Sequence, residues 1–245
     1  MGGELLRREE VGELVGRLSE RDLDVAARGR LLARLTGLLA DGFRVSGARA
    51  AVSGRWLADL VTEIAPHVPV RDLSTLRAHH GGLSGDELAE ALVRAATLAT
   101  AGVGAAGGAL AALQHAAPLT LLAAPVQLTA ETLAVVALEL KLVAELHVVY
   151  GKAPVGPPAQ VMAAYVTAWA ATRGLDPAAG LPAVSVVLAA AARRQLRRRL
   201  VRRLARNVST MAPLLTGAVA GAELNRRETR GLGEALVAEL RPSRG

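Results

Sequence analysis

The residue types best suited to chemistry lie on one otherwise apolar stretch that ends at Tyr150. They are three glutamates, a lysine and a histidine: Glu131, Glu139, Lys141, Glu145 and His147. In a helix this apolar, charged side chains either pair with one another or mark a site. Lys141 and Glu145 are four residues apart and can pair across one helical turn. A di-iron bundle needs Glu-x-x-His, and the spacing from Glu145 to His147 is one residue too short, so we expect no metal centre.

A second candidate functional site is a strongly basic run, residues 193–206, in the last quarter of the chain. Leucines recur between its arginines at helical spacing, so the run predicts an amphipathic helix with an arginine face. The predicted anion-binding and lipid-binding residues are all of its arginines except Arg199: Arg193, Arg194, Arg197, Arg198, Arg202, Arg203 and Arg206.

Guanidinium groups bind both anionic lipid headgroups and nucleic-acid phosphates. The basic run holds no aromatic side chain for base stacking, and no helix-turn-helix, zinc or RNA-binding motif accompanies it. We therefore expect a membrane surface as the partner, with nucleic acid less favoured. A solvated face whose arginines pair with glutamates of the same chain is the remaining alternative.

Two pairs of glycines predict close helix packing. Gly104 and Gly108 form one GxxxG pattern, and Gly217 and Gly221 form another. Glycines one turn apart leave a helix face without side chains, so that a neighbouring helix can approach closely. We expect these four residues to lie at helix contacts.

The first glycine pair lies in an unusually long uncharged stretch. Residues 95–130 include no Asp, Glu, Lys or Arg, and Pro118 and Pro125 interrupt them. A membrane-spanning helix needs roughly 20 apolar residues, so the stretch could supply one span or a hairpin. Its first half is mostly Ala and Gly, which drive insertion weakly. Three interpretations stay open: a tightly packed core hairpin, insertion into a membrane, and a pocket for a hydrophobic ligand.

The composition excludes several classes of protein. The chain has 51% hydrophobic residues but only five aromatic ones, and it has no cysteine. Few aromatic side chains disfavour strands, and the absence of cysteine excludes disulfides, thiolate zinc sites and a cysteine nucleophile. No nucleophile elbow, Walker loop or His-Glu-x-x-His motif occurs. We expect no enzyme activity, cofactor or metal.

The chain divides into two regions that position the candidate residues described above. The first is an N-terminal amphipathic helical region, residues 1–80. The leucines at 31, 32, 35, 38 and 39 form one helix face, and Asp41-Gly42 is expected to end that helix. A further helix is expected from about residue 46 to 65. Charges recur through Asp24, so we expect no secretory signal and a cytoplasmic location.

Residues 84–240 form the second region, which we expect to pack with the first as one unit. Ser84 and Glu87 have the spacing of a capping box and predict a helix start. Gly151 is expected to cap the long helix that ends near Tyr150. Further helices are predicted at about 159–173, from near 182 into the basic run, and at about 212–240, where Gly231 or Gly233 could interrupt the helix.

Three places in this second region resemble the EcsC family. A Gly/Ala-rich helix at 102–110 precedes a proline-containing apolar segment and a long helix. That helix ends in Tyr150-Gly151, similar to the Tyr-Gly that recurs in the family. Residues 213–233 look like the family's Gly-rich helix, followed by Asn225 and the pair Thr229-Arg230. The resemblance covers roughly residues 85–240 and rests on short motifs, and residues 193–206 are unusually basic for the family.

The resemblance implies a membrane-associated helical protein on the cytoplasmic side and carries over no catalytic residue. From the residues we expect an all-α, multi-helix bundle with a Gly/Ala-rich apolar central hairpin. Its expected partner is anionic lipid at a membrane surface, with a membrane protein as a second candidate. The alternative is a soluble helical carrier or scaffold for a hydrophobic ligand or a partner helix. The sequence predicts no oligomeric state.

Overall fold

The computed structural model describes residues 2–20, 23–46, 61, 64–115, 123–173 and 215–242. Within these ranges the chain forms seven α-helices and one short 3₁₀ helix, and no strand, so the predicted all-α multi-helix bundle is confirmed. The elements are α1 (Gly2–Leu18), α2 (Val25–Ser46), η1 (Ala65–His67), α5 (Leu73–His79), α6 (Gly85–His115), α7 (Ala123–Val149), α8 (Pro158–Thr172) and α10 (Leu215–Leu240).

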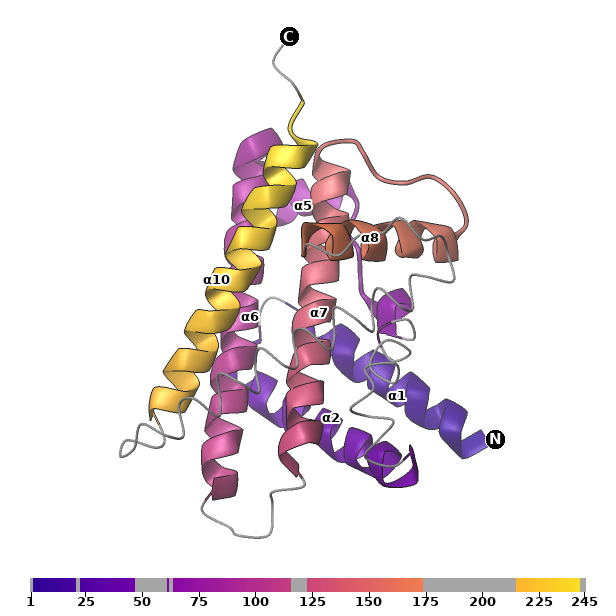
Figure 1. Ribbon diagram of the computed structural model, residues 1–245. Helices are drawn as coiled ribbons and strands as arrows, with labels where there is room; N and C mark the ends of the chain where they lie inside the picture. The colour runs from indigo at the N-terminus through magenta and orange to yellow at the C-terminus, as the bar shows by residue number, and fades with distance from the viewer. Residues whose placement is uncertain are drawn as a thin grey trace.

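The central element is α7, which contacts every other α-helix in the described ranges. It runs through the middle of the molecule, with α6 and α10 on one side and α8 crossing near one end (Figure 1). Each residue from Val126 to Leu146 is buried. A helix that is apolar on all sides belongs in a protein core or a membrane, and here other helices of the same chain surround it.

Helix α10 lies along α6 in the antiparallel direction (Figure 1). Gly221 of α10 meets Gly104 of α6, and Arg241 just beyond α10 pairs with Asp86 at the start of α6. This is the most extensive helix pairing in the described part of the chain. It brings together the two Gly/Ala-rich stretches that lie more than a hundred residues apart in the sequence.

The N-terminal helices share their core with the rest of the protein. The predicted leucine face of α2 is buried at Leu31, Leu32, Leu35 and Leu39, and one hydrophobic cluster runs from Val11 in α1 to Leu240 in α10. The expected end of this helix at Asp41-Gly42 is wrong, because α2 continues to Ser46. A glycine costs a helix only about 1 kcal/mol relative to alanine, which a buried leucine face can outweigh.

The glycine predicted to cap α7 does so. Gly151 has a φ of 65°, its amide donates to the Val148 carbonyl at 3.2 Å, and the Lys152 amide donates to the His147 carbonyl at 2.8 Å. Such a pair of bonds satisfies carbonyls that the last helical turn would otherwise leave open. By contrast, Gly231 and Gly233 do not interrupt α10. The helix predicted at about 46–65 lies mostly outside the described residues.

Candidate functional site: buried charges on the central helix

Four of the ionisable residues singled out in the sequence are buried in the middle of the protein. Glu131, Glu139, Lys141 and Glu145 all lie on α7 and are at most 5% exposed. Burying a charged group costs much free energy unless a partner of opposite charge or hydrogen bonds compensate for the lost water. The partners of these side chains therefore decide whether they form a structural network or a reactive site.

Glu139 receives three donors, one from α8, one from α10 and one from the residue that follows α8. The Trp169 indole Nε1 of α8 donates to its Oε2 at 2.9 Å, and the Thr229 hydroxyl of α10 donates to its Oε1 at 3.0 Å. Arg173, which follows α8, pairs with the same Oε1. Burial by itself lowers the pKa of the Arg173 guanidinium, but the Glu139 carboxylate and, to a smaller extent, the charge of Glu228 outweigh it and raise that pKa above its ordinary value. Glu139 thus joins α7 to both α8 and α10.

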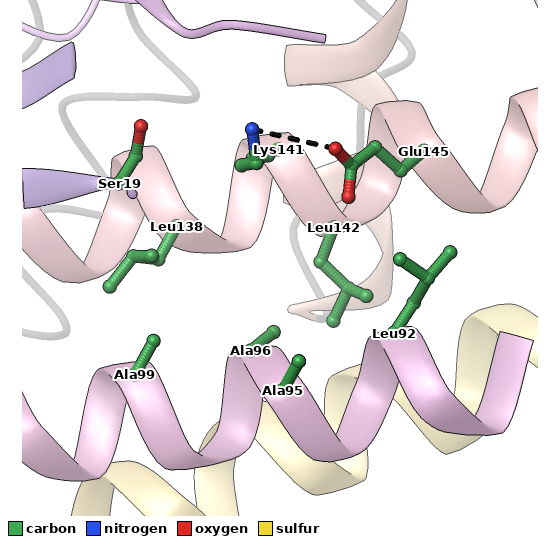
Figure 2. A pocket seen from close by; sticks show the side chains of 9 residues that line it. All are labelled: Ser19, Leu92, Ala95, Ala96, Ala99, Leu138, Lys141, Leu142 and Glu145. Carbon is green, nitrogen blue, oxygen red and sulfur yellow. Dashed lines mark ion pairs between the residues drawn. The ribbon is translucent and has the colours of Figure 1, made fainter. Parts of the chain in front are cut away.

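Lys141 and Glu145 connect α7 to the segment before α5. Their charged atoms lie 3.4 Å apart, so the predicted pairing across one turn is confirmed (Figure 2). The Lys141 ammonium also donates to the Pro69 carbonyl at 2.5 Å, and the Arg71 Nε lies 4.0 Å from Glu145 Oε1. These contacts hold residues 69–71 against the core.

A small pocket opens beside this ion pair, between α6 and α7. Its polar lining comes from Ser19, Lys141 and Glu145, and its remaining walls are apolar side chains of α6 and α7 (Figure 2). The space open to the centre of a water molecule is about 20 Å³, which is room for roughly one water. An acyl chain or an organic cofactor does not fit there. This pocket therefore gives no support to the hydrophobic-ligand interpretation.

Glu131 lies against a glycine that the GxxxG pattern did not include. The Gln127 side-chain amide donates to the Gly107 carbonyl at 2.7 Å and to Glu131 Oε1 at 2.8 Å. A Cβ added to Gly107 would lie 2.3 Å from the Glu131 carboxyl carbon. Gly107 therefore leaves space for this carboxylate between α6 and α7. In the sequence, only the neighbouring glycines Gly107 and Gly108 pointed to this position. The GxxxG spacing instead selected Gly104 and Gly108 as the packing glycines.

Two of the four predicted packing glycines face each other. A Cβ on Gly104 would lie 2.3 Å from the Gly221 carbonyl oxygen, and a Cβ on Gly221 would lie 2.5 Å from the Gly104 carbonyl oxygen. The Asn225 side chain donates to the Thr100 carbonyl at 2.9 Å beside this contact. Gly108 is buried on α6, and Gly217 lies in the first turn of α10, where its surroundings are not described.

The predicted anion-binding arginines all fall within residues 174–214, outside the described residues. The same holds for the helix expected to begin near Pro182. Their contact with lipid stays a prediction from the sequence.

The ring of His147 is engaged within the bundle. Its Nδ1 lies 2.7 Å from the Val143 carbonyl, and the ring packs edge-on against Tyr165 with centroids 5.5 Å apart. Among the described residues no group of three or more His, Asp or Glu side chains could hold a metal ion. Glu139 therefore links α7 to α8 and α10, and Lys141 and Glu145 link it to residues 69–71.

The uncharged stretch 95–130 is divided between two environments. Its part on α7 is buried from Val126 onward, whereas α6 is buried on one side only. Within the described residues one helix, Gly85–Leu110, is long and apolar enough to cross a membrane, with 56% of its apolar window buried inside the protein. Core helices of soluble proteins meet the same criterion, so this observation is weak evidence for a span.

Comparisons of the chain with protein-family models, with curated proteins and with solved structures gave no match. The resemblance to the EcsC family therefore remains a prediction from the short motifs at 102–110, 150–151 and 213–233.

Proposed function

We propose that this protein is a non-enzymatic, membrane-associated protein of the cytoplasmic side that contacts anionic lipid through residues 193–206, hereafter the arginine segment. The observation that carries the proposal is the distribution of charge along the chain. The net charge is +7, and the arginine segment alone contributes eight positive charges. Without it, the chain has 21 basic and 22 acidic residues. All of the excess positive charge is therefore concentrated in this one segment.

No acidic residue is close to these arginines in the sequence. Residues 177–222 contain no Asp or Glu. Three acidic side chains elsewhere pair with other basic residues: Glu139 with Arg173, Asp86 with Arg241, and Glu223 with Arg226 and Arg227. A concentrated positive charge attracts an anionic surface, at about 1 kcal/mol for each basic residue near the headgroups.

The soluble-carrier alternative receives less support. The pocket beside Lys141 holds roughly one water, and the charges buried on α7 bind other parts of the same chain. A nucleic-acid partner uses the same guanidinium chemistry, so it is treated as an outcome of the test. The EcsC resemblance, which implies membrane association, agrees with the proposal.

Vesicle flotation tests the proposal with a matched pair of variants. The test variant replaces four arginines of the segment with glutamine: Arg197, Arg198, Arg202 and Arg203. The control replaces four exposed arginines of the helical body with glutamine, so that the net charge falls equally: Arg17, Arg30, Arg34 and Arg77.

We expect the wild-type protein to float with vesicles containing phosphatidylglycerol at low salt and not with pure phosphatidylcholine. The test variant should lose at least ten-fold in affinity, because four headgroup contacts are removed, while the control stays close to wild type. Equal losses in both variants would mean that only net charge matters. Absence of flotation, together with a salt-dependent shift of nucleic acid, would replace the proposal with a nucleic-acid function.

A further inference from the structure

The outward side of α6 changes from charged to apolar partway along the helix. Its exposed positions are charged at Glu90 and Arg94 and apolar from Leu98 onward, where the side chain is 69% exposed. One helix face then continues with three alanines that are exposed or half-buried: Ala101, Ala105 and Ala109. Large apolar side chains exposed next to further apolar surface mark contact sites more often than isolated ones do.

The outward side of α10 also has an apolar part and a charged part, but the change between them falls at a different height from that on α6. Its Val219 is 66% exposed and lies among half-buried alanines, while Arg226 and Arg227 are exposed further along. The two helices are antiparallel, with Gly104 opposite Gly221 and Thr100 opposite Asn225. Val219 of α10 therefore lies close to the level of Ala105 on α6, whereas Arg226 and Arg227 lie close to the level of Leu98, so the apolar parts of the two outward sides overlap only toward the C-terminal end of α6. The α6–α10 pair forms one outer side of the molecule (Figure 1).

We infer that the apolar part of this side, with Leu98 at its charged edge, is the surface that contacts the acyl region of an anionic bilayer. We call it the α6–α10 face and define it by Leu98, Ala101, Ala105, Ala109 and Val219. The inference rests on the proposed function and names the part of the folded body that accompanies the arginine segment onto the membrane.

Lipid is the occupant because of what adjoins this face in the sequence. Helix α10 begins at Leu215, nine residues after Arg206, and nine residues of chain span at most about 30 Å. Arg206 therefore lies no more than about 30 Å from the start of α10, and no acidic residue lies between the segment and Glu223. An apolar contact and a polybasic contact are each marginal alone, but together they give stable membrane association.

The contact is shallow and does not span the bilayer. At the height of the α6–α10 face, Gln127 and Glu131 of α7 are buried against Gly107 of α6. A spanning arrangement would carry these polar groups across the hydrocarbon layer, which is costly. Interfacial helices bury their apolar side only about 5–10 Å into the boundary between headgroups and acyl chains.

The lack of cysteine allows a direct test by site-specific labelling. Single cysteines replace Leu98, Ala105 or Val219 on the α6–α10 face, and a control cysteine replaces Val155, an apolar and fully exposed residue between α7 and α8. Each cysteine carries an environment-sensitive fluorophore. The labelled proteins are added to phosphatidylcholine–phosphatidylglycerol vesicles whose acyl chains are brominated, so that quenching reports contact with the hydrocarbon.

We expect quenching at residues 98, 105 and 219 to be at least three-fold stronger than at residue 155. Flotation without selective quenching would overturn the inference and leave the proposed function intact. Failure of the wild-type protein to float would overturn both. A blue shift at residue 98 that depends on protein concentration without lipid would assign the face to a second copy of the chain and also overturn the inference.

A pair of charge variants provides an independent measurement. Replacing Leu98 and Val219 with glutamate places two negative charges on the face while leaving the arginine segment unchanged. Both side chains are exposed, so we expect a helical, folded protein whose vesicle affinity falls about ten-fold. Val155→Glu is the matched control and should reduce the affinity little. An unchanged affinity in the double variant would contradict the inference.

Discussion

The central helix α7 and helix α6 of the outer α6–α10 pair both contain long apolar stretches, but their polar residues lie in different environments. Helix α7 is buried on all sides, and its charged side chains bind other elements of the chain. The outer pair is joined by glycines facing each other, and part of its outward side is apolar, with Leu98 and Val219 exposed. An apolar composition alone therefore does not indicate whether a helix belongs to a core or faces lipid.

What separates the two regions is the position of their charges. Glu139 and Lys141 are inside because each has partners that compensate for its loss of water. On α6 the exposed charged residues come before Leu98, and on α10 they come after Val219, so the outward surface near Ala105 and Ala109 carries no charge. The predictions below test first the buried network, then the glycine contact, and finally an exposed cluster.

The largest effect is expected from Glu139→Ala. The substitution leaves the Trp169 and Thr229 donors and the Arg173 guanidinium without their carboxylate, and breaking such a buried pair costs about 3–5 kcal/mol in unfolding free energy. Chemical denaturation followed by circular dichroism measures it. Glu223→Ala, which removes a half-buried carboxylate whose ion pairs lie at the surface of α10, is the control and should change stability little. Similar losses in both variants would contradict a special role for burial.

A smaller loss is expected when the glycine contact is filled. In Gly104→Ala the new methyl group would lie 2.3 Å from the rigid Gly221 carbonyl oxygen, so α6 and α10 must move apart. Such overpacking costs about 1–3 kcal/mol. Gly231→Ala on α10 meets nothing within 4 Å and should instead stabilise the protein by about 0.5–1 kcal/mol. Thermal unfolding should therefore show shifts of opposite sign, and two shifts of the same sign would refute the contact.

The smallest effect concerns an exposed cluster at the far end of the α6–α10 pair. The Tyr150 hydroxyl donates to Asp86 Oδ1 at 2.7 Å, and Arg241 lies 3.1 Å from the same carboxylate. Burial, together with the hydrogen bond to Asp86 and its charge, raises the pKa of Tyr150 to about 12.

A tyrosine pKa raised on folding stabilises the protein below the ordinary pKa of about 10 and loses that contribution as the pH rises through about 12. Stability measured between pH 9 and 12 should therefore fall, and less steeply in Tyr150→Phe than in the wild type. Identical slopes would show that this hydroxyl does not contribute.

The sequence predicted the features that depend on local pattern. The buried leucines of α2, the glycine cap at Gly151 and the pairing of Lys141 with Glu145 all follow from spacing along one helix. The predicted end of α2 at Asp41-Gly42 was wrong. The free energy that these two residues cost the helix is smaller than the free energy that tertiary packing of the helix can contribute.

The partners of the buried charges could not be predicted. Glu139 meets Thr229 ninety residues away, and Lys141 meets the Pro69 carbonyl 72 residues away. Nothing in the local sequence encodes such contacts, because they arise only when α8, α10 and residues 69–71 pack against α7. Gly107 was missed for the same reason, since its role depends on the position of the Glu131 side chain.

Fractionation of cells tests the central claim, peripheral association with an anionic membrane, most directly. The membrane fraction is washed first with high salt and then with alkaline carbonate, and the protein is followed by immunoblot. We predict that it sediments with membranes, is partly released by salt and is fully released by carbonate without detergent. Complete recovery in the first soluble fraction, or a requirement for detergent, would contradict the account.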